Sequence, residues 1–190
     1  MLQVYTGAGK GKTTAAIGLA VRALGAGMRV YMMQFMKGLA YSEQTILRGF
    51  APRFVLATTG KPFFVAEKGM LSEEELAAWG DGVVVFEPGR PPKDYVTMIE
   101  AGFDEAVREI RSGAYGLAIL DEANVALFFG LLGREKVEAL LDDVPKETEL
   151  VMTGRNAPDW LVERADLVTE MREVRHYYQR GVEARKGIEN

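Results

Sequence analysis

Two patterns of apolar residues follow one another repeatedly along this chain. Nearly continuous apolar runs, which are typical of buried strands, are predicted at residues 2–6, 29–35, 53–57, 83–86, 117–120, 149–153 and 167–171. Between these runs, apolar residues recur at helical spacing, and the first such stripe consists of Ile17, Ala20, Val21 and Leu24. Gly25 or Gly27 ends this helix. Alternating strands and helices predict an α/β fold with a mostly parallel central sheet and helices on both faces.

The longest amphipathic stripe lies at residues 96–110, and its pattern ends at Gly113. Shorter helices are predicted at residues 72–79, 134–141 and 159–164. Residues 58–92 contain many Gly and Pro residues, which favours an irregular functional loop, and residues 172–190 form a charged, poorly periodic tail. Since no repeat or linker divides the chain, we expect a single domain over residues 1–190.

The charge balance of the chain is acidic. Its 190 residues include 23 Lys and Arg against 27 Asp and Glu, for a formal net charge of −4, which gives no general attraction for nucleic acid or anionic lipid. The chain has no Cys, which excludes disulfides, thiolate nucleophiles and thiolate metal sites. No apolar run approaches the roughly 18 residues of a membrane span, and residues 1–4 lack the features of a signal peptide. We therefore expect a cytoplasmic protein with no membrane and no nucleic-acid partner.

A glycine-rich segment joins the first predicted strand to the first predicted helix. It consists of Gly7, Ala8, Gly9, Lys10, Gly11, Lys12, Thr13 and Thr14. Phosphate-binding loops occur at this position, because glycines let backbone N–H groups turn inward and the helix N-terminus adds positive potential. Lys12 is predicted to reach the phosphates, and the Thr13 hydroxyl to ligate Mg²⁺. The segment therefore predicts a P-loop nucleotide site, and an ordinary strand-to-helix turn is the alternative.

This loop is one residue shorter than the standard pattern. The standard pattern has four residues between its first Gly and its Gly-Lys pair, whereas only three residues lie between Gly7 and Gly11 here. Thr6 therefore stands at the position of the first Gly of the standard pattern. A tighter loop surrounds the phosphates of a nucleotide differently. The usual hydrolytic geometry, with water in line with the γ-phosphate, is therefore not assumed.

A pair of acidic residues supplies a second part of the nucleotide site. Asp121 and Glu122 directly follow a predicted buried strand, at the edge where α/β sheets bind their ligands. Carboxylates at that edge can hold Mg²⁺ directly or through water. Acidic residues also favour the first turn of a helix, so a plain helix start is the alternative for this pair.

Several sequence blocks follow one another along nearly the whole chain. They are GAGKGKTTAA at 7–16, AVRALGAG at 20–27, QFMKG at 34–38, LDE at 120–122, TGRNAP at 153–158, ADLVTEM at 165–171 and HYYQRGVEARKGIE at 176–189. In these blocks the sequence resembles the ATP:corrinoid adenosyltransferases of the cobalamin-synthesis type, which have a similarly shortened phosphate loop. The blocks together are far more specific than a phosphate loop alone.

The resemblance implies a reaction between ATP and a reduced corrinoid. The Co(I) of the corrinoid attacks C5′ of ATP, a cobalt–carbon bond forms, and inorganic triphosphate leaves. The nucleophile then belongs to the corrinoid, while the protein positions the reactants and stabilises the departing negative charge. The family also implies a homodimer and a reductase that supplies Co(I).

The resemblance further implies which residues hold the triphosphate. ATP is expected to lie reversed in the loop, bound by the loop N–H groups, by Lys12 and by Mg²⁺ on Thr13 and Glu122. Arg155, in the family's Thr-Gly-Arg block, is a further predicted phosphate contact because a guanidinium pairs well with phosphate oxygens. A surface salt bridge is the alternative for Arg155.

Aromatic residues are expected on the corrinoid side of the site. Family members carry an aromatic segment, often Gly-Phe-Thr-Trp, whose rings exclude the lower axial ligand of cobalt. The corresponding stretch here is residues 60–65, where Phe63 or Phe64 would take that role and the Trp is absent. Core packing is the alternative for both rings. Because the first predicted strand begins at residue 2, the N-terminal extension that covers the corrinoid in some members is expected to be absent.

Two other classes of function fit parts of the sequence. A P-loop phosphotransferase or ATPase would act at the γ-phosphate and release ADP or phosphate. A non-enzymatic nucleotide-gated protein, either a dimerising switch or a corrinoid carrier, would show no turnover. The signature Lys of such switches is absent, because Gly7 stands five residues before Lys12.

His176 is the single histidine of the chain and a candidate cobalt ligand. Cobalt-ligating corrinoid motifs read Asp-x-His-x-x-Gly, whereas Val174 stands here in place of the Asp and the Gly falls at position 181. We therefore predict that His176 packs within the tail or contacts the nucleotide.

Overall fold

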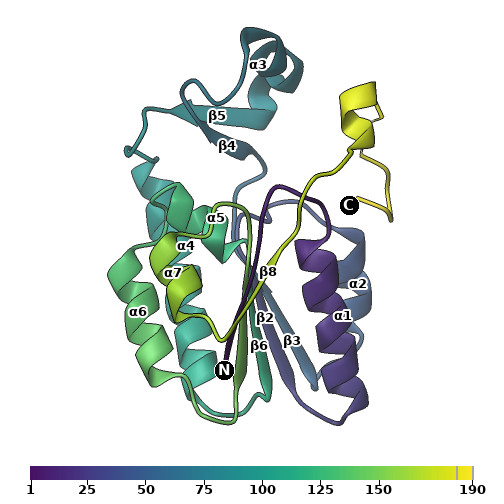
Figure 1. The fold of residues 1–190 in the computed structure, drawn as a ribbon, viewed down its shortest axis with the longest axis vertical. Coiled ribbons are helices and arrows are strands. Elements are labelled where there is room, and N and C mark those ends of the chain that lie inside the picture. The colour runs from purple at the N-terminus through teal and green to yellow at the C-terminus, as the bar shows by residue number, and fades with distance from the viewer. Residues whose placement is uncertain (183, 190) are drawn as a thin grey trace.

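Parallel strands form the central layer of the molecule, which is described for residues 1–182 and 184–189 in a computed structural model (Figure 1). The strands of the main sheet are β1 Leu2–Thr6, β2 Val30–Gln34, β3 Phe54–Thr58, β6 Leu117–Asp121, β7 Glu149–Thr153 and β8 Leu167–Glu170. They form a six-stranded sheet in the order β3-β2-β6-β7-β1-β8. Since all their pairings are parallel, their carboxyl ends share one edge of the sheet.

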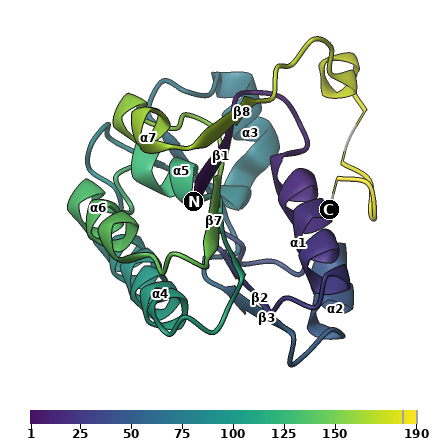
Figure 2. The ribbon, with the colours of Figure 1, turned by 60° about the horizontal axis from the view of Figure 1, so that its bottom comes forward.

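Helices cover both faces of this sheet (Figure 2). One face carries α1 Lys12–Gly25 and α2 Ser42–Arg48, and the other carries α4 Lys93–Arg111, α5 Ala123–Phe128, α6 Arg134–Asp143 and α7 Asp159–Arg164. The stripe on α4, which includes Ile99, Phe103 and Ile110, is buried in one core, while Ala16 and Ala20 of α1 belong to the other. All residues of β2 and β6 are buried, as expected for strands that are covered on both sides. The predicted α/β fold is confirmed.

A second, smaller unit stands beyond the carboxyl edge of the main sheet (Figure 1). It pairs the parallel strands β4 Phe64–Glu67 and β5 Val83–Phe86, with α3 Glu73–Trp79 and the 3-10 turn η1 Gly80–Gly82 between them. A capping box begins α3, because the side chains of Ser72 and Glu75 each accept from the other's backbone N–H. The helix and β5 confirm the predictions at 72–79 and 83–86. The sequence pattern does not predict β4, which makes residues 64–86 a βαβ unit inside the segment expected to be irregular.

Two short helices, α2 and α5, are also absent from the sequence-based prediction. Only Gln44 and Leu47 of α2 are buried, while Ile46 is 66% exposed, so the helix has too few buried positions to show a periodic stripe. α5 begins directly after Glu122, so the acidic pair both ends a strand and starts a helix. Within the described residues, none of the helices has the length and apolar character to cross a membrane.

Candidate functional site

A pocket of about 660 Å³ lies at the carboxyl edge of the main sheet. Its walls include Gly9–Thr14 of the phosphate loop, Lys37 and Tyr41–Glu43 from the segment after β2, Glu122, Arg155, His176 and Gly187–Glu189 of the tail. The predicted loop therefore meets Glu122 and Arg155 at one site. Gly7, Ala8 and Asp121 are not among the described residues that line the pocket.

The phosphate loop requires glycine at particular positions. Gly7 and Gly11 have φ values of 93° and 113°, which L side chains rarely adopt. Gly9 donates its N–H to the Met171 carbonyl over 2.6 Å, and a Cβ on Gly7 would overlap the same oxygen. The chain after β8 thus packs directly against the loop and leaves no space for side chains there.

Lys12 is only 7% exposed and lies inside its own loop. Its Nζ donates to the carbonyl oxygens of Gly7 and Gly9, each over 2.7 Å. Burial lowers the pKa of this ammonium, while the negative charge of Glu122 acts in the opposite direction. The carbonyl oxygens of the loop therefore fix the position of the ammonium inside the loop.

Asp121, at the end of β6, is fully buried and accepts three side-chain hydrogen bonds. Its Oδ1 accepts from the Thr13 hydroxyl over 2.8 Å and from the Thr153 hydroxyl over 2.7 Å. Its Oδ2 accepts from Gln34 Nε2 over 3.3 Å. Both oxygens of Asp121 are therefore occupied by protein donors, and the acid fixes the orientation of Thr13.

Glu122 faces the pocket directly after Asp121. Its backbone is left-handed, with a φ of 61°, and its N–H donates to Thr153 Oγ1 over 3.1 Å. Burial and the neighbouring Asp121 raise the pKa of its carboxyl, and the cations of Lys37 and Lys12 oppose this. In the described part of the chain, no three His, Cys, Asp or Glu residues cluster as a metal site would require. A cation at Glu122 would therefore need hydroxyl, water or phosphate oxygens as additional ligands.

Arg155 enters the pocket from the loop after β7. The preceding Gly154 has a φ of 133°, and its carbonyl accepts from Asn124 Nδ2 over 3.1 Å. The same amide donates to the Tyr5 carbonyl over 3.3 Å. The fully buried Asn124 therefore ties the ends of β1 and β7 together and sets the start of the loop that carries Arg155.

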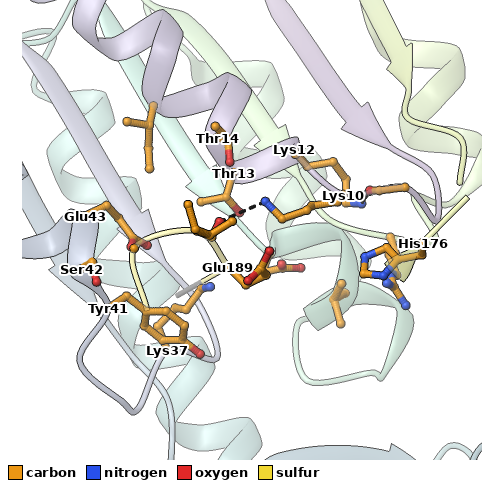
Figure 3. Close-up of a pocket in the computed structure, with 18 of the residues that line it drawn as sticks. Lys10, Lys12, Thr13, Thr14, Lys37, Tyr41, Ser42, Glu43, His176 and Glu189 are labelled. Atoms are coloured by element: carbon orange, nitrogen blue, oxygen red, sulfur yellow. Dashed lines mark hydrogen bonds between the residues drawn. The ribbon is translucent and has the colours of Figure 1, made fainter. Parts of the chain in front are cut away.

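The C-terminal tail, with the 3-10 turn η2 Tyr177–Arg180, returns to the phosphate loop. Lys10 Nζ donates to the Ile188 carbonyl over 3.1 Å (Figure 3). The neighbouring Glu189 accepts from Arg185 Nη2 over 3.0 Å, which folds the tail back on itself. His176 also lines the pocket, and its predicted contact with the nucleotide stays a prediction.

Sequence reasoning named His176 of the tail as a possible nucleotide contact, but it missed residues 187–189 and the segment after β2. Lys37 and Tyr41 come from that segment, with Lys37 Nζ 4.1 Å from the centroid of the Tyr41 ring. A usable signal for Lys37 was its position after a buried strand, at the edge where ligands bind. For residues 187–189 no comparable signal exists, because their return to the loop is a contact between residues 178 positions apart.

The two aromatic candidates have different surroundings. Phe63 is half-buried against the main core and meets the Tyr95 ring edge-on, with 5.9 Å between centroids. Phe64 is 48% exposed and meets the Trp79 ring edge-on at 4.7 Å. Neither Phe is among the described residues that line the pocket. The core-packing alternative therefore describes Phe63, whereas Phe64 is a surface aromatic residue on β4.

This chain is similar to known proteins along its whole length. The model of the family described as "ATP:corrinoid adenosyltransferase BtuR/CobO/CobP" matches residues 1–190. A corrinoid adenosyltransferase of Pseudomonas aeruginosa is 33% identical over 190 residues, which covers 100% of this chain and 83% of that protein. One of Sinorhizobium sp. is 32% identical over 191 residues, covering 100% and 79%. One of Escherichia coli K12 is 30% identical over 187 residues, covering 98% and 83%.

Proposed function

Because the chain belongs to the ATP:corrinoid adenosyltransferase family and transfers the adenosyl group of ATP to a corrinoid, we propose that the pocket at the carboxyl edge of the main sheet binds ATP. The observation that carries this proposal is the meeting of the phosphate loop with Glu122 and Arg155 at one pocket. Its volume of about 660 Å³ lies within the usual range for small-molecule sites.

We assign the triphosphate of ATP to residues 7–14 and to Arg155. The loop N–H groups and the start of α1 favour anionic oxygens, and Lys12 and Arg155 add two positive charges to the same pocket. We propose that ATP lies reversed relative to standard P-loop proteins, an arrangement that the shortened loop favours. In that orientation C5′ stays accessible to the corrinoid.

We propose that Thr13 and Glu122 ligate Mg²⁺. The Thr13 hydroxyl donates its proton to Asp121, so its lone pairs are free for a cation. A hydroxyl and a carboxylate, completed by water and phosphate oxygens, make a donor set that Mg²⁺ prefers. Because both oxygens of Asp121 already accept hydrogen bonds from the protein, we propose that Asp121 does not bind the metal itself but holds Thr13 in place. When bound, Mg²⁺ neutralises charge on the triphosphate.

The reacting bond in this proposal is the one between C5′ and the oxygen of the α-phosphate. The electron pair of Co(I) forms the cobalt–carbon bond, and the pair of the broken bond leaves on the triphosphate. No proton has to move, so Lys12 and Arg155 act by positioning the triphosphate and neutralising its charge. Since the corrinoid must arrive as Co(I), we propose that a reductase is a partner of the protein.

The corrinoid is proposed to meet the exposed aromatic rings of the smaller unit. Phe64 and its neighbour Trp79, which is 40% exposed, lie on the part of the chain that stands beyond the carboxyl edge (Figure 1). Trp79 was not a sequence candidate, and its contact with Phe64 supplies an indole ring that residues 60–65 lack. Phe63 contributes to this proposal only by anchoring the start of β4 to the core.

A product assay tests the proposed site chemistry. The protein is incubated with ATP, Mg²⁺ and chemically reduced cobalamin, and the expected products are a light-sensitive adenosylcorrinoid and inorganic triphosphate. Release of ADP or phosphate with the ribose unchanged would support a phosphotransferase or ATPase instead. Tight binding of the adenosylcorrinoid without turnover would support a carrier.

Three further expectations stay predictions of the sequence: a homodimer, a cytoplasmic location and a single domain over residues 1–190. We propose that the dimer is the working form of the enzyme, on the basis of the family alone. Light scattering on the purified protein measures this directly, and a monomer that retains full activity would contradict it.

A further inference from the structure

The segment after β2 carries a lysine, Lys37, that belongs neither to the phosphate loop nor to the proposed Mg²⁺ site. Lys37 lines the pocket at the end away from Lys12, beside Tyr41 (Figure 3). We propose that Lys37 is a second triphosphate-binding residue, which contacts the phosphate oxygens of ATP and of the triphosphate product. This inference rests on the proposed ATP site.

The backbone at Lys37 is held on both sides. Its N–H donates to the Thr59 carbonyl over 3.1 Å, and the Thr59 N–H donates to the Gln34 carbonyl over 2.9 Å. The preceding Met36 has a left-handed φ of 59°, which is uncommon for a long side chain. Gly60 permits the close approach, because a Cβ there would lie 2.6 Å from the Lys37 nitrogen. A strained turn that its surroundings hold in this way is typical of a functional site.

The side chain of Lys37 is also held in place. Lys37 is a partly buried residue, and its Nζ lies 4.1 Å from the centroid of the Tyr41 ring, a cation–π contact that restrains a lysine without neutralising it. Lys37 and Glu122, the proposed Mg²⁺ ligand, line the same pocket.

Lys37 shares its pocket with the carboxyl groups of Glu43 and Glu122, but in the part of the chain that the structure describes it forms no close ion pair. None of the ion pairs among those residues includes Lys37. By contrast, Lys68 and Lys136 pair with carboxylates, and Lys10 and Lys12 donate to backbone carbonyls. An ammonium that no carboxylate holds in a close ion pair stays available to an anionic ligand in the same pocket.

The position of Lys37 suits the charge that develops in the reaction. When the C5′–O bond breaks, its electron pair stays on the triphosphate, whose negative charge increases. Lys12 neutralises this charge from inside the loop, and Lys37 does so from the other end of the pocket. Fixed cations aimed at developing charge stabilise a transition state. Lys37 remains protonated throughout and transfers no proton.

Binding of inorganic triphosphate tests the inference without turnover. Isothermal titration calorimetry with Mg²⁺ and tripolyphosphate compares the wild type with Lys37→Met, Lys37→Arg and Lys12→Met. The matched control is Lys136→Met, which removes the same charge from an exposed ion pair with Asp104. We expect Lys37→Met to bind about 10- to 100-fold more weakly. Lys37→Arg should retain most of the affinity, and Lys136→Met all of it.

The binding results distinguish a failure of the Lys37 inference from a failure of the proposed ATP site. If Lys12→Met binds weakly and Lys37→Met binds like the wild type, the inference is wrong and the ATP site stands. If both variants bind like the wild type, the ATP site is wrong as well. Lys37→Gln is measured beside Lys37→Met, so that a loss of folding in one variant does not decide the result.

Discussion

Thr13 Oγ1 donates a hydrogen bond of 2.8 Å to Asp121 Oδ1, which joins the first turn of α1 to the end of β6. The same oxygen accepts from the Thr153 hydroxyl over 2.7 Å, so one buried acid couples α1, β6 and β7. Because the Thr13 proton points at Asp121, the lone pairs of its hydroxyl stay available to a cation. The hydrogen bond between Thr13 and Asp121 therefore links the phosphate loop to the proposed metal site.

Thr13→Val tests this coupling, because valine keeps the shape of the side chain and removes the hydroxyl. We expect the Mg²⁺ concentration for half-maximal adenosylation to rise by about tenfold or more. Loss of a hydrogen bond to a carboxylate should also lower the free energy of unfolding by about 1.5–3 kcal/mol. Mg²⁺ titration of the rate and urea denaturation measure these effects, and Thr13→Ser is the matched control. An unchanged Mg²⁺ titration for Thr13→Val would remove Thr13 from the metal site.

Glu122 should make the stability of the protein depend on pH. Burial and Asp121 raise the pKa of its carboxyl above the ordinary value of 4.5, so the folded state holds the proton more tightly than the unfolded chain. By linkage, the stabilising effect of this proton is complete below the ordinary pKa and is lost as the pH rises through the raised pKa. Glu122→Gln cannot ionise, and in Mg²⁺-free buffer it should be more stable than the wild type at neutral pH.

Thermal unfolding as a function of pH measures the Glu122 effect. The difference in Tm between Glu122→Gln and the wild type should shrink as the pH falls toward the ordinary pKa, where both side chains are neutral. The variant should also show a weaker stabilisation by added Mg²⁺ and ATP. A variant that is less stable than the wild type at every pH would mean that the ionised carboxylate is compensated within the folded chain.

The central part of the site could be predicted because local sequence determines it. A buried apolar run places Asp121 at the carboxyl edge of the sheet, and the glycines around Lys12 predict a loop whatever the rest of the chain does. The Arg155 candidate came from the family resemblance, and the structure places it in the same pocket. Strand ends in a parallel sheet converge, so positions after different strands can be combined before the strand order is known.

The parts that could not be predicted depend on tertiary contacts. Met36 and Glu122 adopt left-handed backbones, although neither is a residue type that favours them. The contact of Lys10 with Ile188 joins the two ends of the chain and has no local signal. Trp79 of α3 meets Phe64 of β4 inside the βαβ unit, and the four-residue strands of this unit leave little alternation in a sequence.

Alanine at Phe63 and at Phe64 should separate packing from substrate contact. Phe63→Ala removes a half-buried ring from the core and from Tyr95, and should lower the free energy of unfolding by about 1–3 kcal/mol. Phe64→Ala changes an exposed side chain, so stability should stay within about 0.5 kcal/mol while KM for the corrinoid rises. Urea denaturation, KM for the corrinoid and the spectrum of bound Co(II) corrinoid measure the three effects. If the spectrum and KM are unchanged in Phe64→Ala, the aromatic assignment is wrong.

Gly7→Ala and Gly18→Ala form a matched pair that tests the packing of the phosphate loop. A Cβ on Gly7 would overlap the Met171 carbonyl, and its φ of 93° disfavours any side chain, whereas a Cβ on Gly18 of α1 would meet no atom within 4 Å. Gly18→Ala should raise the free energy of unfolding by about 0.5–1 kcal/mol, because alanine favours the helix. Gly7→Ala should lower it by about 1–3 kcal/mol and weaken triphosphate binding, because the loop must move away from Met171. If Gly7→Ala instead matches the wild type in urea denaturation and in calorimetry, the close approach of the loop to the chain after β8 is not needed to form the anion site.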